Sequence, residues 1–223
     1  MIRTHALFTR LTRRTTLPTV PKLVKIIGAA WAVTLVVAAL PIWRLEAITR
    51  PAVALTQALG FGLMIVIPPI TAGYAALIAS FEAERPVYRL IQLTLLPRMA
   101  RVMDLHHAAL YRLRWLYAGL ACVFPALMIS GFYTGMTTGR DAISSSGIMI
   151  FAGIVWFGLA ALVGSALGVY LGLRFRHHPA PLVAAPVLLI GFMGLGALLL
   201  VCPFYFAAPI ALTTLLNQAE KYA

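Results

Sequence analysis

Two pairs of adjacent histidines are the residues of this chain that could most readily do chemistry: His106-His107 and His177-His178. One imidazole from each pair could ligate a metal ion, a haem or a chlorophyll-type pigment if the two segments met. Adjacent histidines on a helix point about 100° apart, so one pair cannot readily chelate a metal by itself. We therefore expect no metal and no cofactor, and we interpret all four histidines as interfacial polar residues beside arginines.

Other catalytic signals are absent from the sequence. None of the three lysines, Lys22, Lys25 and Lys221, stands in the Gly-Lys-Ser/Thr context of a phosphate-binding loop, so ATP hydrolysis by that route is excluded. The two cysteines, Cys122 and Cys202, lie in separate apolar segments and are expected to be buried, inert thiols. We predict no catalytic residue and no enzymatic activity.

The elements that would position these residues are long apolar segments. Apart from Lys25 near the start of the first, they contain no Asp, Glu, Lys or Arg, and they run over Val24–Trp43, Ala52–Ser80, Leu116–Tyr133, Ile148–Leu173 and Leu182–Leu216. A helix of about 20 apolar residues crosses the hydrocarbon layer. With 61% hydrophobic and 11% charged residues, the chain is predicted to be all-α. We expect a polytopic integral membrane helix bundle, with five spans in a single transmembrane domain over residues 1–223.

Prolines interrupt the two longest segments. Pro68-Pro69 predicts a kink or break in the second segment, because proline removes a helical hydrogen bond. The last segment is too long for one span, so we expect a span near residues 182–202 and a shallower piece near 204–217 that lies at the outer surface or re-enters the membrane. The alternative is a short sixth span that returns the C-terminus to the inside.

The basic residues predict the orientation. Of the 18 Lys and Arg residues, 14 fall on one side of a five-span arrangement, and basic residues are retained in the cytoplasm. The N-terminus is therefore expected inside and the C-terminus outside a prokaryotic cytoplasmic membrane, the cell inner membrane. The net charge of +12 is interpreted as this topology signal together with attraction to anionic membrane lipids, and not as nucleic-acid binding.

Two polar segments flank the spans on the cytoplasmic side. Residues 1–23 are basic, and Ala6, Leu7 and Leu11 share one helical face, which is typical of a helix lying in the headgroup region. A disordered basic tail is the alternative. Residues 81–114 form the longest hydrophilic segment and predict an amphipathic helix pair broken at Pro97, with Val102, Leu105, Ala109 and Leu113 on one face of the second helix. This segment is the predicted partner-docking surface.

One small-residue motif lies within the fourth apolar segment. Gly164 and Gly168 are four residues apart, and this spacing lets two helices approach closely in lipid. We assign the pair a helix-packing role, although glycine is common in membrane helices and the match can arise by chance.

The loop after the second span resembles that of ABC-2-type transporter membrane subunits, the permeases that pair with a separate ATPase. The likeness rests on Glu84-Arg85, Leu90-Ile91 and the run from Leu93 to Pro97, in the same order and place. The partner-docking residues on this interpretation are Glu84, Arg85, Tyr88, Leu93, Thr94 and Pro97.

The resemblance implies a permease-like subunit in an oligomer or multi-subunit complex. It would move a hydrophobic or lipid-like substrate with its ATPase. In this chain Pro86 replaces the family's acidic residue and a clear sixth span is missing. An alternative therefore stays open, a non-catalytic accessory or structural subunit of a larger respiratory or photosynthetic membrane complex. Its partners would be other membrane subunits.

Overall fold

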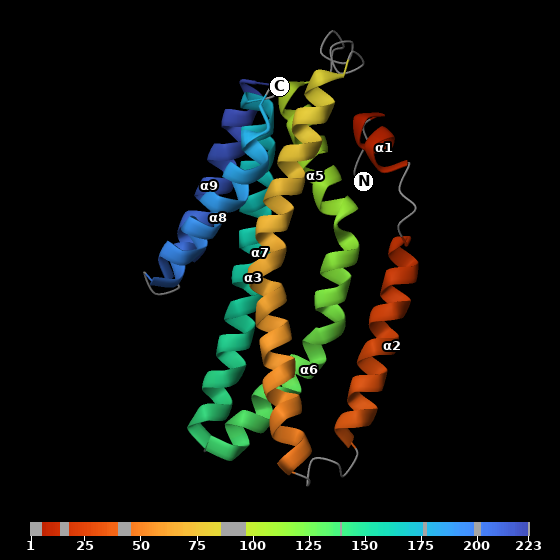
Figure 1. Ribbon diagram of the computed structural model, residues 1–223, viewed down its shortest axis with the longest axis vertical. Helices are drawn as coiled ribbons and strands as arrows, with labels where there is room; N and C mark the ends of the chain where they lie inside the picture. The colour runs from red at the N-terminus through yellow and green to blue at the C-terminus, as the bar shows by residue number, and fades with distance from the viewer. Residues whose placement is uncertain are drawn as a thin grey trace. The chain divides into compact units, whose positions relative to one another are not determined.

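All the secondary structure that the computed structural model describes is α-helical, as the sequence predicts (Figure 1). The structure describes residues 6–13, 18–39, 46–85, 97–138, 140–175, 178–198 and 202–222. Its helices are α1 (Ala6–Arg13), α2 (Val20–Ala39), α3 (Glu46–Glu84), α5 (Arg98–Arg112), α6 (Arg114–Thr138), α7 (Arg140–Arg174), α8 (Ala180–Leu198) and α9 (Cys202–Glu220).

Four of the described helices are long and apolar enough to cross a membrane. The candidate spans are Val20–Ala38, Ile48–Glu84, Arg114–Met136 and Phe151–Arg174. They correspond to the first four apolar segments of the sequence, and they bear out the prediction of a helical membrane protein. The apolar part of α8, Ala180–Gly194, is shorter than these four. A total of five or six spans stays a prediction.

No break interrupts α3 at Pro68-Pro69, where the sequence analysis allowed one, and the helix continues to Glu84. Packing explains why. Ile67 is 1% exposed and Pro68 is fully buried. Tertiary packing of a helix face supplies most of the stability of helices in proteins, and here it offsets the hydrogen bonds that the two prolines remove.

The helices form two compact units, which we describe separately. Unit 1 comprises Met1–Thr16, Ile67–Leu113 and Trp156–Ala223, and unit 2 comprises Leu17–Val66 and Arg114–Val155. The described helices of unit 1 are α1, α5, α8 and α9 with the later parts of α3 and α7. Those of unit 2 are α2 and α6 with the earlier parts of α3 and α7.

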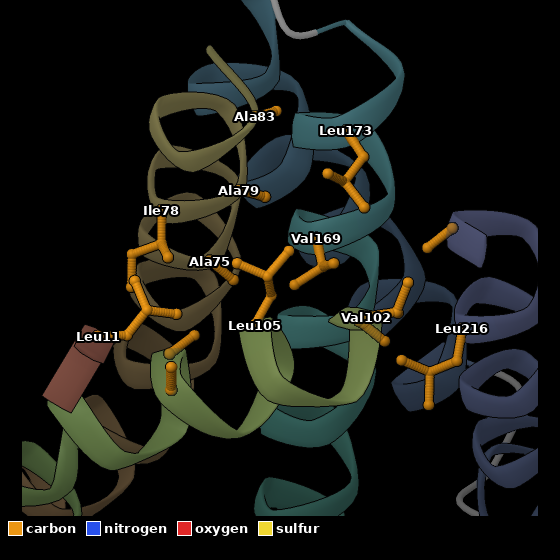
Figure 2. Packing of buried hydrophobic residues seen from close by; sticks show 14 residues of the cluster. Leu11, Ala75, Ile78, Ala79, Ala83, Val102, Leu105, Val169, Leu173 and Leu216 are labelled. Atoms are coloured by element: carbon orange, nitrogen blue, oxygen red, sulfur yellow. The ribbon is translucent and has the colours of Figure 1, made fainter. Parts of the chain in front are cut away.

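Helix α5 is at the centre of the core of unit 1 (Figure 2). Its apolar face follows the predicted spacing, since Val102, Leu105 and Ala109 are each 0% exposed. Leu105 lies between Ala75 of α3 and Val169 of α7, while Val102 is directed toward Leu216 of α9. The second half of the 81–114 segment is therefore an interior helix and not a free surface.

The C-terminal segment, for which the sequence predicts a shallower piece near 204–217, is a single helix in the structure, and its depth in the membrane stays a prediction. Helix α9 spans 19 residues and lies beside α8 (Figure 1). Its residues Leu216 and Ala219 belong to the same core as Leu11 of α1. The ring of Tyr222 lies 6.0 Å from that of Tyr170, so α9 brings the C-terminus back to the end of unit 1 where α7 finishes. Proline did not prevent this, because Pro203 is in the first turn and Pro209 is accommodated inside the helix.

Candidate functional site

The predicted docking residues begin at the C-terminal end of α3. Glu84 and Arg85 are exposed there, and the Arg85 guanidinium Nη1 lies 3.0 Å from the Glu82 carboxylate Oε1. Glu82 itself is buried, at 4% exposed, so this ion pair ties the exposed arginine to the helix. Pro97 is also exposed. Tyr88, Leu93 and Thr94 lie outside the described residues.

A cavity of about 210 Å³ adjoins Glu84. It is lined by residues of α3, of the α7–α8 connection and of α8: Leu77, Ser80, Phe81, Glu84, His178, Pro179 and Leu182. The fold thus brings a carboxylate of the predicted docking segment and an imidazole of the second histidine pair to one cavity. Sequence analysis placed both on the same side of the membrane but gave no signal that they meet.

Helix α5 carries three buried polar residues. Arg101, Asp104 and His106 are 4%, 5% and 4% exposed respectively. The Nε and Nη1 atoms of Arg101 have no hydrogen-bond partner among the described residues. Buried polar atoms of a charged group that lack partners cost free energy. This guanidinium is such a group, as are the carboxylates of Glu82 and Asp104, each with one oxygen without a hydrogen-bond partner among the described residues.

His106 is an interior residue, which corrects its assignment as an interfacial histidine. Its Nδ1 lies 2.9 Å from Oγ of Ser165 on α7, and that hydroxyl donates to the Leu162 carbonyl, also at 2.9 Å. Because a hydroxyl has one proton, its oxygen accepts the hydrogen bond from Nδ1–H of the neutral imidazole. Burial lowers the pKa of His106 to about 4, with a further contribution from the neighbouring His107.

The ring of His107 lies 5.5 Å from that of His106. His107 and His178 are exposed, and His177 lies outside the described residues. Within the described part of the chain, no three His, Cys, Asp or Glu side chains gather in a group that could hold a metal ion. What unit 1 offers chemically is therefore buried charge and hydrogen bonding between helices.

The glycines of α7 lie where its backbone approaches that of α3 in unit 1. A Cβ atom at Gly168 would lie 2.2 Å from the Ala72 carbonyl oxygen, and one at Gly164 would lie 3.1 Å from that of Pro68. Gly172 extends the series, with the Ala76 carbonyl oxygen at 2.5 Å. Sequence analysis missed Gly172, although its spacing of four from Gly168 was a usable signal.

The face of α3 that meets these glycines carries small side chains. Alanines at Ala72, Ala75 and Ala79 present small side chains to the glycines, and all three are fully buried. The Ser80 hydroxyl donates to the Gly172 carbonyl oxygen at 3.3 Å. The later parts of α3 and α7 therefore pack backbone to backbone, and this contact fixes the end of α3 that carries Glu84.

The N-terminal helix α1 docks on α5 by a polar contact. Arg112 donates to the Leu11 carbonyl oxygen, from Nε at 2.9 Å and also from Nη2. Leu11 is one of the last residues of α1, so the guanidinium satisfies a carbonyl that has no partner within its helix. The Phe8 and Tyr111 rings meet edge to face at 5.8 Å. Helix α1 is thus held by the protein itself, which goes beyond the predicted contact with headgroups.

Comparison with known proteins gives no relative from which a role could be transferred. No protein-family model, no curated protein and no solved structure matches this chain.

Proposed function

We propose that this chain is a permease-like membrane subunit of an ABC-2-type transporter, which moves a hydrophobic or lipid-like substrate with a separate ATPase. One observation carries the proposal. Helix α5 follows the Glu84-Arg85 segment in sequence and packs within unit 1 against α1, α3, α7 and α9. A partner that moved this region would act directly on apolar helices.

The packing of α5 is suited to transmitting force. Leu105 and Val102 are fully buried among residues of α3, α7 and α9, and protein interiors are close-packed and transmit strain. A displacement of α5 must therefore displace its neighbours. Glu84 and Arg85 remain exposed at the end of α3, where a partner can reach them.

The geometry of unit 1 supports a cytoplasmic location for both termini. If α8 and α9 act as a pair of crossings, the C-terminal Lys221 joins the side that holds most of the basic residues. Of the 18 Lys and Arg residues, 15 then lie on that side, and only Arg44, Arg50 and Arg140 lie on the other. This arrangement satisfies the positive-inside rule better than five spans do. On this proposal the N-terminus lies in the cytoplasm of a prokaryotic cell.

A cavity in unit 2 supports an apolar substrate. Its volume is about 270 Å³, and it lies between α2, α6 and the earlier part of α3. Its lining is apolar except for three hydroxyls, which belong to Thr34, Thr56 and Ser130. Each hydroxyl already donates to a backbone carbonyl of its own helix. The cavity therefore offers contact area and few free polar groups, which suits an acyl chain or another apolar molecule.

Affinity purification from the native membrane tests the proposal. A nucleotide-binding subunit should co-purify with the wild-type chain, and Glu84→Ala or Arg85→Ala should reduce its recovery while the chain stays folded. Lys221→Ala is the matched control, because Lys221 is exposed on unit 1 and far from Glu84 in sequence. Full recovery of an ATPase by both variants would remove the docking role. Absence of any ATPase from the wild-type preparation would reject the transporter.

The alternative, a non-catalytic accessory subunit of a larger membrane complex, is favoured by the burial of α5. Arg101, Val102 and Leu105 face the interior, so less of the 81–114 segment is free for a partner than the sequence predicts. On this alternative the same purification would recover a redox or pigment-binding complex, and its absorption spectrum would identify it.

A further inference from the structure

We propose that the N-terminal end of α5 is a phosphate-binding site in which Arg101 and Arg98 hold the phosphate of an anionic lipid headgroup. The proposal rests on unit 1 alone and does not depend on the transporter function. It accounts for the guanidinium whose Nε and Nη1 have no hydrogen-bond partner within the described part of the chain.

The first turn of α5 has the features of an anion site. Pro97 occupies the N-cap and provides no side-chain hydrogen bond, and no acidic residue lies in the first turn. The first amides of a helix have no partners within it and carry the positive end of the helix dipole. Anions bind to such ends, and nothing in the first turn of α5 supplies negative charge in their place.

Two arginines at different depths complete the site. Arg98 is exposed, whereas Arg101 is 4% exposed one turn further along. Helical side chains lean toward the N-terminus of their helix, and this lean favours a position of the Arg101 guanidinium near the uncapped turn, on its buried side. Arg98, in the first turn itself, is on its exposed side. Together they can provide several charge-assisted hydrogen bonds to one phosphate.

The membrane supplies a suitable ligand at this position. Basic clusters at the cytoplasmic surface attract anionic lipids, and the exposed Pro97 and Arg98 leave the turn accessible. A free phosphate offers the same chemistry, so the experiment must distinguish these two sources. The competing partner within the protein is Asp104, which is buried one turn beyond Arg101 and has an interaction of its own.

Native mass spectrometry and thermal unfolding of the detergent-purified chain provide the test. Phosphatidylglycerol should be retained in preference to phosphatidylcholine, and it should raise the melting temperature of the wild-type chain. Arg101→Gln should weaken this binding about 10- to 100-fold, as expected for charged hydrogen bonds. Arg98→Gln, which changes an exposed residue and leaves the core intact, should weaken it up to about 5-fold.

Two controls separate the site from diffuse attraction. Lys22→Gln removes one positive charge from the first turns of another basic helix, α2, where Lys22 is exposed, and it should leave phosphatidylglycerol retention unchanged. Arg101→Lys keeps the charge and should restore part of the binding.

The outcomes decide between the possibilities. Equal protection by inorganic phosphate would support the phosphate site and overturn the lipid as its source. Equal retention of both lipids by the wild-type chain would overturn the site. Unchanged retention of phosphatidylglycerol in Arg98→Gln and Arg101→Gln would also overturn the site. Arg101 would then be interpreted as a partner of Asp104 and not of a lipid phosphate. An equal loss in Lys22→Gln would also overturn the site, since the attraction would then be diffuse.

Discussion

The glycines where α7 packs on α3 in unit 1 have surroundings opposite to those of Gly28 and Gly119 in unit 2. In unit 2, a Cβ atom at Gly28 or Gly119 would meet no other atom within 4 Å, whereas in unit 1 one at Gly168 would lie 2.2 Å from the Ala72 carbonyl. Lipid tails are as apolar as leucine, so helices associate in a membrane by close packing and not by hiding apolar surface. The difference shows that the close backbone contacts of α3 and α7 give unit 1 its specificity. Gly28 of α2 and Gly119 of α6 make no such contact.

The two units also differ in which side chains they bury. Only 6% of the most apolar window of α2 is buried, and its one described polar link to α6 runs from Trp31 Nε1 to the Ala121 carbonyl oxygen at 2.8 Å. Unit 1 instead buries Glu82, Arg101, Asp104 and His106. Unit 1 therefore pays the desolvation cost of charged groups, and its closely packed helices hold them in place.

The largest effect is expected from Gly168→Val. The added side chain would collide with the Ala72 carbonyl oxygen and the Ala75 Cβ, both of which are held in helix α3. Overpacking lowers the free energy of unfolding, and because this contact is rigid we expect a loss of about 3 kcal/mol or more. Denaturation in detergent, followed by circular dichroism, measures the loss. Gly28→Val is the matched control, and an equal loss there would remove the distinction between the units.

Acid should destabilise unit 1 through His106. Its pKa is about 4 in the folded chain and about 6.5 when unfolded, so between these values the unfolded chain binds more protons. The free energy of unfolding therefore falls as the pH is lowered from 6.5 toward 4, by about 2 kcal/mol between pH 7.5 and pH 4.5. His106→Gln should flatten this dependence. The exposed His107→Gln should leave most of it, and identical curves for wild type and His106→Gln would refute the assignment.

Gly60→Ala examines a close approach of a different kind within unit 2. A Cβ there would lie 2.4 Å from Cδ1 of Leu127, the end of a flexible side chain and not a backbone atom. Leu127 can change rotamer, so the cost is expected to be about 1 kcal/mol. Adding Leu127→Ala should remove the clash, and a double-mutant cycle measures the coupling. A coupling near zero would show that the clash is relieved without Leu127.

The smallest effect is expected from Trp31→Phe. Phenylalanine keeps the aromatic contact with Phe124, whose ring centroid lies 6.2 Å away, and loses the hydrogen bond to Ala121. The cost should be about 1 kcal/mol or less, seen as faster amide exchange in α2 with α5 unchanged. A larger loss that also reached α5 would show that the two units unfold together.

The local elements of the chain follow from its sequence. The apolar segments Val24–Trp43 and Leu116–Tyr133 became α2 and α6, because an apolar run in lipid must satisfy its own backbone by forming a helix. The spacing of Val102, Leu105 and Ala109 likewise determined which face of α5 is apolar, since helical periodicity is a local property. The pairing of Gly164 with Gly168 identified a small-residue face without naming the helix that packs on it.

Only the tertiary structure decided what those faces contact. It placed α5 inside unit 1, joined His106 to Ser165 across 59 residues of sequence, and left Arg101 buried with unpaired nitrogens. It also folded α9 back along α8 to bring Tyr222 to Tyr170, where the sequence predicted a shallow piece. Polar residues read as surface residues in a sequence, because burial depends on neighbours that are distant along the chain and close only after the helices have packed.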